Sequence, residues 1–403
     1  MTEESAKTNK TSLMQPWLDD FDEIRGFFDE EVHSSVTRLC SDNTFVDLLS
    51  AFFTLTQSGS QDLESQDNKH HGNLKQTLKS TFAKLQSISN IDELQELTSS
   101  IASPIIDMSV SHLSFSGLDQ LSTDQHYLFI SNHRDIVMDP LLLNLLLHRN
   151  KHQTAHCAIG DNLLKNHIAL EFALLNKCFK ILRSLTSPRA ILKAMKLQAA
   201  YIRHLSFNKS DNIWIAQKEG RSKDNLDKTN PALIKMLGLA KPKEMLFGKY
   251  INELNIIPVS FSYEWDPCDI DKATELEITE QQGHYNKESI EDLTAVKKGL
   301  LQPKGSVHVH FGDELLKHNI DQMKHSEIAE LIDQSIAKHN KAYPVSFAAA
   351  AALNSNALKE TDTALFSKNE IEKAATELEN RLENCSEVIR KRVLLNYATP
   401  IIR

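Results

Sequence analysis

The chain has 403 residues, of which 41% are hydrophobic and 25% are charged, a composition typical of soluble globular proteins. Its length exceeds that of one ordinary hydrophobic core and predicts two or three domains. The formal net charge of −9 argues against a nucleic-acid binder, and five scattered cysteines without CxxC spacing argue against a disulfide framework or a cysteine-based zinc site.

The N-terminal region, 1–108, is expected to be helical. Apolar residues recur at three- and four-residue steps between 17 and 56 and again between 74 and 97, which predicts amphipathic helices. The polar stretch between them, 58–73, contains two glycines and is expected to be a loop. The opening residues lack the apolar core of a secretory signal, and no stretch reaches the ~18 consecutive apolar residues of a membrane span.

Short apolar segments alternate with amphipathic segments over residues 109–343. The expected strands are 127–131, 155–159, 178–182, 213–216, 256–262 and 306–311, and the expected helices are 140–149, 188–206, 230–238, 285–300 and 325–340. This alternation predicts an α/β fold with a layered, mixed sheet and flanking helices. The C-terminal region, 344–403, is expected to be helical again, because Ser367 and Glu370 form a capping box before an apolar stripe.

Positive charge is concentrated between Lys177 and Lys249, where sixteen Lys and Arg residues stand against five Asp and Glu residues. A basic segment in an acidic protein indicates a local anion site or a membrane-facing patch. The alternative, a solvated helix face, explains a part of this run.

Motif spacing excludes several classes of enzyme. The closest pair among the twelve glycines, Gly299 and Gly305, is six residues apart, so G-x-G-x-x-G, Walker A and G-x-S-x-G motifs are all absent. The kinase-like HRD triplet at 133–135 is followed by Pro140 where a kinase catalytic loop has asparagine. Dinucleotide, P-loop, kinase and ordinary serine-hydrolase chemistries are therefore not expected.

Histidine spacing gives only weak support for a metal site. His148, His152 and His156 would share one face of a continuous helix, but that helix is expected to end before the following strand. His308 and His310 alternate on one face of an expected strand and are expected to be structural. We therefore expect no bound metal.

The segment SNHRDIVMDP (131–140) places a histidine and two aspartates directly after an expected strand, where α/β sheets present reactive groups. With a carboxylate fixing its tautomer, His133 can take a proton from an alcohol through its other ring nitrogen. Either Asp135 or Asp139 could supply that carboxylate. Pro140 suits the first position of a helix, so Asp139 is expected to be both the N-cap and the partner of His133. The alternative for His133 is packing under the loop.

This segment resembles the first motif of the glycerolipid acyltransferases, the family of glycerol-3-phosphate and lysophosphatidate acyltransferases. Three further blocks follow in the order of that family: GDNLL (160–164) with FKILR (179–183), IWIAQKEGRSK (213–223) and IIPVSFSYEWD (256–266). The resemblance covers about 110–315, with a motif core at 126–266. It departs from the family at two points: Asp139 lies one residue farther from His133 than usual, and the third block is one residue short at 219–222.

The resemblance implies an O-acyltransferase that moves a long-chain acyl group from acyl-CoA or acyl-carrier protein to a hydroxyl of glycerol-3-phosphate or lysophosphatidate in phospholipid biosynthesis. Such chemistry needs a base for the alcohol and donors for the oxyanion, but no metal or redox cofactor. His133 would be the base and Asp139, with Asp135 as the alternate, would orient it. The substrate-binding residues implied are Arg183, Lys218, Glu219, Gly220, Arg221, Ser222 and Pro258.

Arginine forks suit a phosphate-bearing acceptor, and Arg183 and Arg221 could supply them with help from Lys218 and Ser222. Two alternatives stay open. Arg183 could pair with an acidic neighbour instead, and Glu219 could simply hold a turn.

The protein is expected in the cytoplasm, peripherally associated with the inner membrane. The leucine-rich run after the motif and the basic segment could make that contact, although the leucines are more simply explained as core. Two rival functions remain: a lipid-binding or scaffold protein of the same fold without turnover, and acyl transfer to another lipid acceptor.

Overall fold

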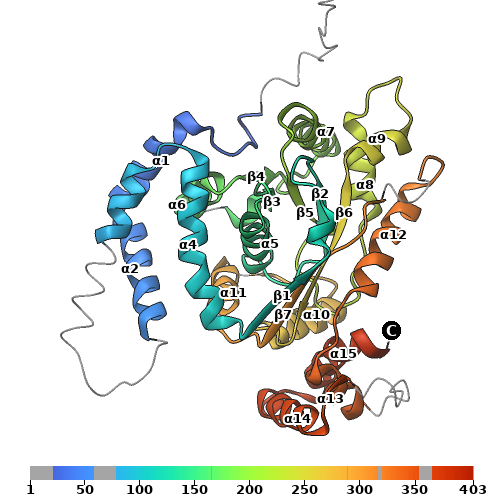
Figure 1. The fold of residues 1–403 in the computed structure, drawn as a ribbon. Coiled ribbons are helices and arrows are strands. Elements are labelled where there is room, and N and C mark those ends of the chain that lie inside the picture. Colours follow the sequence, from blue (N-terminus) through green and yellow to red (C-terminus); the bar gives the residue numbers. More distant parts are fainter. Residues whose placement is uncertain are drawn as a thin grey trace, which may run out of the picture.

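A computed structural model describes residues 21–58, 79–164, 166–287, 289–315, 320–353 and 365–402. In these ranges a seven-stranded sheet has helices on both faces, and further helices lie toward both ends of the chain (Figure 1). The strands are β1 (His112–Ser116), β2 (Leu128–Ser131), β3 (His156–Gly160), β4 (Cys178–Ile181), β5 (Ile213–Ala216), β6 (Ile256–Tyr263) and β7 (Ser306–Phe311). The expected α/β fold with a mixed sheet and flanking helices is confirmed.

The strand order is β1-β7-β6-β2-β5-β3-β4. All neighbouring strands are parallel except β6 and β7, which are antiparallel. β2 lies in the middle of the sheet, between β6 and β5. Because β6, β2, β5, β3 and β4 run in one direction, the loops that follow them meet at a single edge of the sheet, where ligands bind in such folds.

The six expected strands are all present, whereas β1 was not expected. Its sequence HLSFS contains two serines, and it lies at the edge of the sheet, where it pairs only with β7 and has no fully buried residue. The segment does alternate polar and apolar residues, but it has only two apolar positions in five residues and is too short to stand out as a strand.

The helices that flank the sheet are α5 (Met138–Arg149), α6 (His167–Leu175), α7 (Pro188–His204), α8 (Pro231–Leu237), α9 (Phe247–Glu253), α10 (Asp269–Gln282), α11 (Ser289–Leu301) and α12 (His325–Lys338). Alternate residues of β2 face opposite sides of the sheet. Leu128 and Ile130 pack in the cluster formed with α7, α8 and α12, while Phe129 packs in the cluster formed with α5. The leucines of α5 are almost all buried in that second cluster, so the leucine-rich run is core.

The N-terminal part contains α1 (Asp29–Ser41), α2 (Asn43–Ser58), a helical stretch at 79–87 and α4 (Ile91–Ser109). The helical prediction for 17–56 is confirmed from Asp29 onward, as two helices separated at Asp42, whereas 21–28 are not helical and 17–20 lie outside the described residues. The helical prediction for 74–97 is confirmed at 79–87 and from Ile91, with a break at 88–90, and 74–78 lie outside the described residues. Of the expected loop at 58–73, Ser58 ends α2 and the rest lies outside the described residues.

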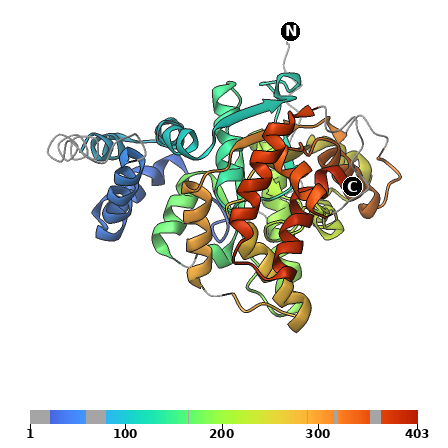
Figure 2. The same ribbon diagram turned by 90° about the horizontal axis from the view of Figure 1, so that it is seen from below.

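Three described helices follow α12: α13 (Pro344–Ala352), α14 (Lys368–Leu382) and α15 (Glu387–Ile402). Ser367 caps α14 in the expected box with Glu370. The three helices share a buried cluster that includes Ala273 of α10, so they pack against the sheet domain as well as one another (red in Figure 2). The division of the chain at 108 and 343 into separate domains stays a prediction.

Candidate active site

His133 lies in the loop that joins the C-terminal end of β2 to α5. Its carbonyl oxygen accepts a hydrogen bond from the N–H of Ser222 at 2.7 Å. Its ring meets the indole of Trp214, on β5, edge to face with 5.6 Å between ring centroids. The indole is itself held, because Trp214 Nε1 donates to Ser131 Oγ at 2.9 Å. The position of His133 is thus fixed by contacts with Trp214 of β5 and with Ser222 in the segment that follows β5.

Asp139 contacts the imidazole directly, with Oδ2 at 2.9 Å from His133 Nδ1. The same oxygen accepts the backbone N–H groups of Arg134 at 2.6 Å and Asp135 at 3.0 Å, and Oδ1 accepts the hydroxyl of Tyr263 at 2.7 Å. The carboxylate is completely buried. Burial, with the nearby carboxylates, raises the pKa of Tyr263, so its hydroxyl keeps the proton that it donates. Asp139 therefore orients the ring and leaves Nε2 for other partners.

Asp135 serves the start of α5 instead. Its Oδ1 accepts the N–H groups of Val137 at 3.0 Å and Met138 at 2.9 Å. Since α5 begins at Met138, the prediction that Asp139 is the N-cap was wrong: Asp139 is the second helical residue, and Asp135 satisfies the first N–H groups. Burial, reinforced by the charge of Asp139, raises the pKa of Asp135.

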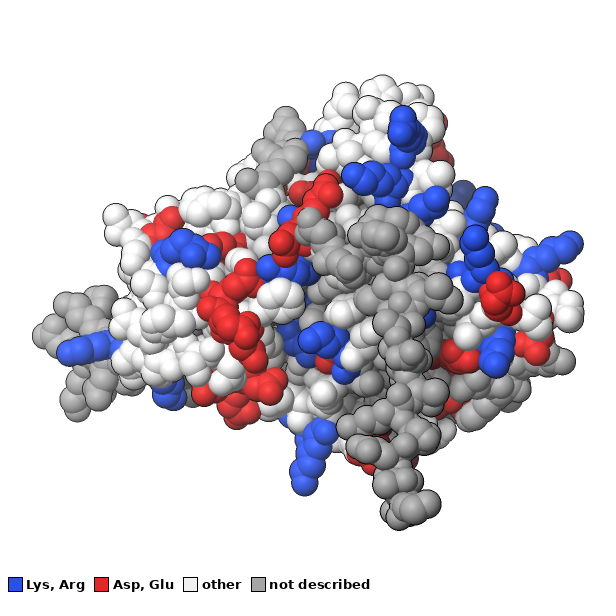
Figure 3. Space-filling model, turned by 90° about the horizontal axis from the view of Figure 1, so that it is seen from above, with Lys and Arg blue, Asp and Glu red and all other residues white. Residues whose placement is uncertain are grey.

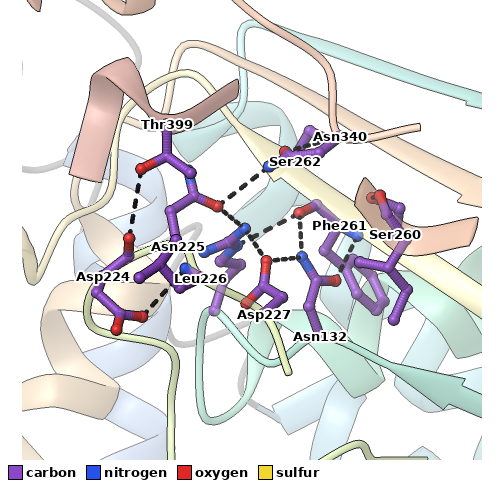
Figure 4. Close-up of polar contacts among 12 residues, drawn as sticks. Asn132, Asp224, Asn225, Leu226, Asp227, Ser260, Phe261, Ser262, Asn340 and Thr399 are labelled. Atoms are coloured by element: carbon purple, nitrogen blue, oxygen red, sulfur yellow. Dashed lines mark hydrogen bonds and ion pairs between the residues drawn. The ribbon is translucent and has the colours of Figure 1, made fainter. Parts of the chain in front are cut away.

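The loop around His133 is held by the side chains of its two neighbours. The amide of Asn132 pairs with the main chain of Phe261 on β6, accepting its N–H at 2.7 Å and donating to its carbonyl at 3.0 Å. The guanidinium of Arg134 bonds to Asp227 at 2.5 Å and to Asn225. Figure 4 shows Asn132, Asn225, Asp227 and Phe261 converging on this point.

The C-terminal helices reach the same loop. Asn225 donates to the carbonyl of Asn396 on α15 at 3.0 Å. The hydroxyl of Thr399, which donates to the carbonyl of Leu395 at 2.7 Å, also lies 3.4 Å from the carbonyl of Asp224 (Figure 4). On the other side, buried Lys272 of α10 donates to the carbonyl of Arg134 at 2.6 Å. Arg134, which follows His133, is therefore held by residues that lie more than 90 positions away in the sequence.

A cavity of about 130 Å³ lies beside His133 at the C-terminal edge of the sheet. One part of its wall is apolar and includes Ile136, Ile159, Leu163 and Trp214. Another part is cationic and consists of Arg183, Lys218, Arg221 and Lys287, with Asp292 beside Lys287. A cavity of this kind suits a ligand that combines an anionic group with an apolar one.

Some of the predicted binding residues line the cavity and others do not. Gly220 joins Arg183, Lys218 and Arg221 in the cavity wall. Glu219 is exposed and lies 3.6 Å from Arg183, which is the pairing that was left open. Ser222 and Pro258 do not line the cavity. Ser222 contributes its N–H to the carbonyl of His133, while Pro258 is buried within β6 opposite Ile130 of β2.

Arg221 has an unsatisfied donor. Its Nη1 is buried and has no hydrogen-bond partner. Burial opposes the charged form, but Cys268, followed by Asp266 and Asp135, raises the pKa of Arg221 nonetheless. A buried guanidinium N–H without a partner is costly, so an anion in the adjoining cavity would stabilise it.

Sequence reasoning missed three groups of this site. Tyr263 falls inside the fourth block, but only its contact with Asp139 shows its role. Trp214 falls inside the third block as part of a strand. Lys287 lies between α10 and α11, far from any block, and nothing in its local sequence indicates that it reaches the cavity.

Among the described residues, no group of three or more His, Cys, Asp or Glu side chains could hold a metal ion. The three histidines considered for a metal are separated: His148 is paired with Glu96 at 2.9 Å, and His156, on β3, is paired with Asp211 at 3.3 Å. None of the helices in the described ranges is both long and apolar enough to cross a membrane.

Comparison with known proteins gives one match that bears on function. Residues 112–260 match the family model described as Acyltransferase, which spans β1 to most of β6 and includes His133 and Asp139. The crystal structure of the 1-acyl-sn-glycerophosphate (LPA) acyltransferase PlsC from Thermotoga maritima is similar at 12% identity and a TM-score of 0.36, covering 73% of this chain and 97% of that chain. No curated protein matches the chain significantly.

Proposed function

Residues 112–260 form a domain of the acyltransferase family, and from this premise we propose that the protein transfers a long-chain acyl group from a thioester to a hydroxyl of a glycerol-phosphate lipid precursor. The observation that carries the proposal is the His133–Asp139 pair at the wall of a cavity that is partly cationic and partly apolar. The cationic wall suits the phosphate of glycerol-3-phosphate or lysophosphatidate, and the apolar wall suits acyl-chain carbons.

In the proposed reaction, His133 Nε2 takes the proton of the acceptor hydroxyl while its oxygen attacks the thioester carbonyl. Asp139 stabilises the imidazolium that forms. The tetrahedral intermediate collapses, the carbon–sulfur bond breaks, and the thiolate leaves with the proton from the imidazolium. The products are an ester and a free thiol, so the step balances without a redox partner or metal. Acyl-CoA and acyl-carrier protein are the two proposed donors.

Contact with a membrane surface is proposed through α7 instead of the buried leucines of α5. Ile191 and Leu192 are exposed on α7, at 40% and 47%, beside exposed Arg189, Lys193 and Lys196. On the face seen in Figure 3, Lys and Arg gather over the side of the molecule that carries α7 and α9. Apolar side chains flanked by cations are typical of helices that lie on anionic bilayers. The helix follows Arg183 of the cavity wall by only a few residues.

The experiment that tests the function is release of free CoA from palmitoyl-CoA, measured with and without glycerol-3-phosphate or lysophosphatidate. We expect release that depends on one acceptor and a new ester in the lipid products. His133→Ala, checked for folding by circular dichroism, is the matched inactive control. Binding of acyl-CoA without acceptor-dependent release in the wild type would favour a lipid-binding protein without turnover, and transfer only to an acceptor lacking phosphate would contradict the proposed acceptor class.

A further inference from the structure

A second cavity, of about 190 Å³, adjoins the cavity of His133. Arg221 and Lys287 line both, so these two cations form a common wall. Besides the two cations, the second cavity is lined by residues of α10, of α11 and by Tyr285 between these helices. An anion held by Arg221 and Lys287 would therefore have open space on two sides, one toward His133 and one away from it. A phosphate monoester needs only the first of these spaces, whereas a phosphate diester needs both.

The far side of the second cavity offers hydrogen-bond acceptors. It is lined by the carboxylates of Asp271, Glu275 and Glu291 and by the hydroxyls of Thr274, Thr294 and Tyr285.

The hydroxyl protons there are already used. Tyr285 donates to Glu291 at 2.7 Å, and Thr274 and Thr294 donate to the helix carbonyls of Ile270 and Ile290 at 2.8 and 2.9 Å. Each hydroxyl can therefore act toward a ligand only as an acceptor.

Two of the carboxylates, those of Glu275 and Asp271, can accept hydrogen bonds beyond their ion pairs. Glu275 is paired with Lys223 at 2.7 Å and Asp271 with Lys298 at 2.6 Å, but an ionised carboxylate can accept about four hydrogen bonds. A ligand group in this cavity would therefore be recognised if it donates N–H or O–H bonds, and a group without donors would leave polar oxygens unpaired.

Resting on the proposed acyl transfer, we propose that the second cavity holds the polar head group of a phosphodiester acceptor. The acceptor is a lysophospholipid whose phosphate lies between Arg221 and Lys287, whose free glycerol hydroxyl faces His133, and whose head group carries amine or hydroxyl donors. The unpartnered Nη1 of Arg221 supplies the phosphate with a donor at the boundary of the two cavities. Glu275 and Thr274 then determine which head groups are accepted.

The test compares four lysophospholipids with the same acyl chain as acceptors of palmitoyl groups from palmitoyl-CoA. The ethanolamine and glycerol forms carry donors, the choline form has a head group without donors, and lysophosphatidate has no head group. We expect kcat/KM for the first two to exceed that for the last two by at least about fivefold. A preference for lysophosphatidate, or equal use of the choline form, overturns the inference and leaves the proposed function intact. No transfer to any of the four, nor to glycerol-3-phosphate, overturns the proposed function itself.

Two variants locate the head group. Thr274→Trp fills the cavity, and Glu275→Gln removes one carboxylate at nearly constant volume. In both, the ratio of kcat/KM for the ethanolamine form to that for lysophosphatidate should fall by about tenfold, and the lysophosphatidate rate reports that the variant is folded. Thr376→Trp, at an exposed position of α14 outside both cavities, is the control and should keep the wild-type ratio. An unchanged ratio in both cavity variants contradicts the placement.

Discussion

Asp139 holds the ring of His133 at 2.9 Å through an oxygen that also accepts two backbone N–H groups of the same loop. With Tyr263 on its other oxygen, the carboxylate cannot turn away without breaking several bonds at once. Such an arrangement fixes the tautomer of the histidine and keeps a negative charge next to the ring, which favours the imidazolium formed when a proton is taken. The carboxylate of Asp135 instead caps the start of α5 by accepting the N–H groups of Val137 and Met138.

The first prediction separates these two aspartates. Asp139→Asn should lower turnover by ~10²-fold or more, because the amide cannot stabilise the imidazolium and favours the wrong tautomer. Asp135→Asn keeps an oxygen for Val137 and Met138, so it should cost at most ~1 kcal/mol of stability and much less activity. Steady-state rates and thermal melts of both variants check this. An active Asp139→Asn beside an inactive Asp135→Asn would reverse the assignment.

The second prediction concerns the link from the C-terminal helices to the loop. Asn225 has a positive φ of 56°, so Asn225→Gly removes its contacts with Arg134 and Asn396 without straining the backbone. We expect kcat to fall by about tenfold with little change in KM for either substrate, because the loop loses order while the cavity wall remains. Asn255→Gly, at another positive φ of 49° near the start of β6, is the matched control. A loss of stability with unchanged kcat would show that the contact is only structural.

Most of the sheet could be predicted from the sequence, because its central strands are short apolar runs that are buried on both sides. Local pattern did not identify β1, because only two of its five residues are apolar and it lies at the edge of the sheet. It also misplaced the start of α5: Pro140 is compatible with the first turn of a helix, but the capping carboxylate comes from Asp135, so the helix begins two residues earlier.

The candidate site was predictable where its residues follow strands and not where they come from distant helices. His133 and the cationic residues after β4 and β5 stand at strand ends, where position alone indicates a ligand edge. Lys272, Asn396 and Lys287 reach the site only through tertiary packing, and nothing in their local sequence marks them.

The third prediction concerns the two cavity arginines. Arg221→Ala should raise KM for a phosphate-bearing acceptor by about tenfold to a hundredfold, the loss expected for a charge-assisted fork of ~1.5–3 kcal/mol. Arg183→Ala should have a smaller effect, because its side chain is 29% exposed and already close to Glu219. Initial rates over a range of acceptor concentrations measure both. If KM for the acceptor stays at the wild-type value in Arg221→Ala, this arginine does not bind the phosphate.

The fourth prediction concerns membrane contact. Replacing Ile191 and Leu192 together by serine should lower co-sedimentation with anionic vesicles by several-fold, since the two exposed side chains would no longer enter the bilayer interface. Wild-type binding should also weaken as salt rises, because screening shortens the reach of the neighbouring cations to ~8 Å at physiological ionic strength. Val388→Ser, at an exposed apolar position of α15, is the control. Equal binding of all three proteins to vesicles would exclude α7 as the contact.

The last prediction concerns stability in acid. His310 of β7 stacks on His339 with 3.6 Å between ring centroids, and Ser116 of β1 bonds to its Nδ1 at 2.8 Å. Burial, with the nearby charges of His339, His308 and Lys338, lowers the pKa of His310 to about 4, while Asp313 acts in the opposite direction. An unfolded chain has the ordinary histidine value near 6.5, so between pH 6.5 and 4 the unfolded state binds more protons than the folded state.

Stability should therefore be complete above about pH 6.5 and fall as the pH drops toward 4. His310→Gln removes this titration, so urea unfolding of the variant should lose less stability than the wild type between pH 7.5 and pH 5. His308, whose pKa burial also lowers, leaves a part of the acid sensitivity in place. The exposed His112 of β1 provides the control variant His112→Gln, which should keep the wild-type pH dependence. If His310→Gln and the wild type lose the same stability on acidification, the stacked pair does not hold His310 in its neutral form.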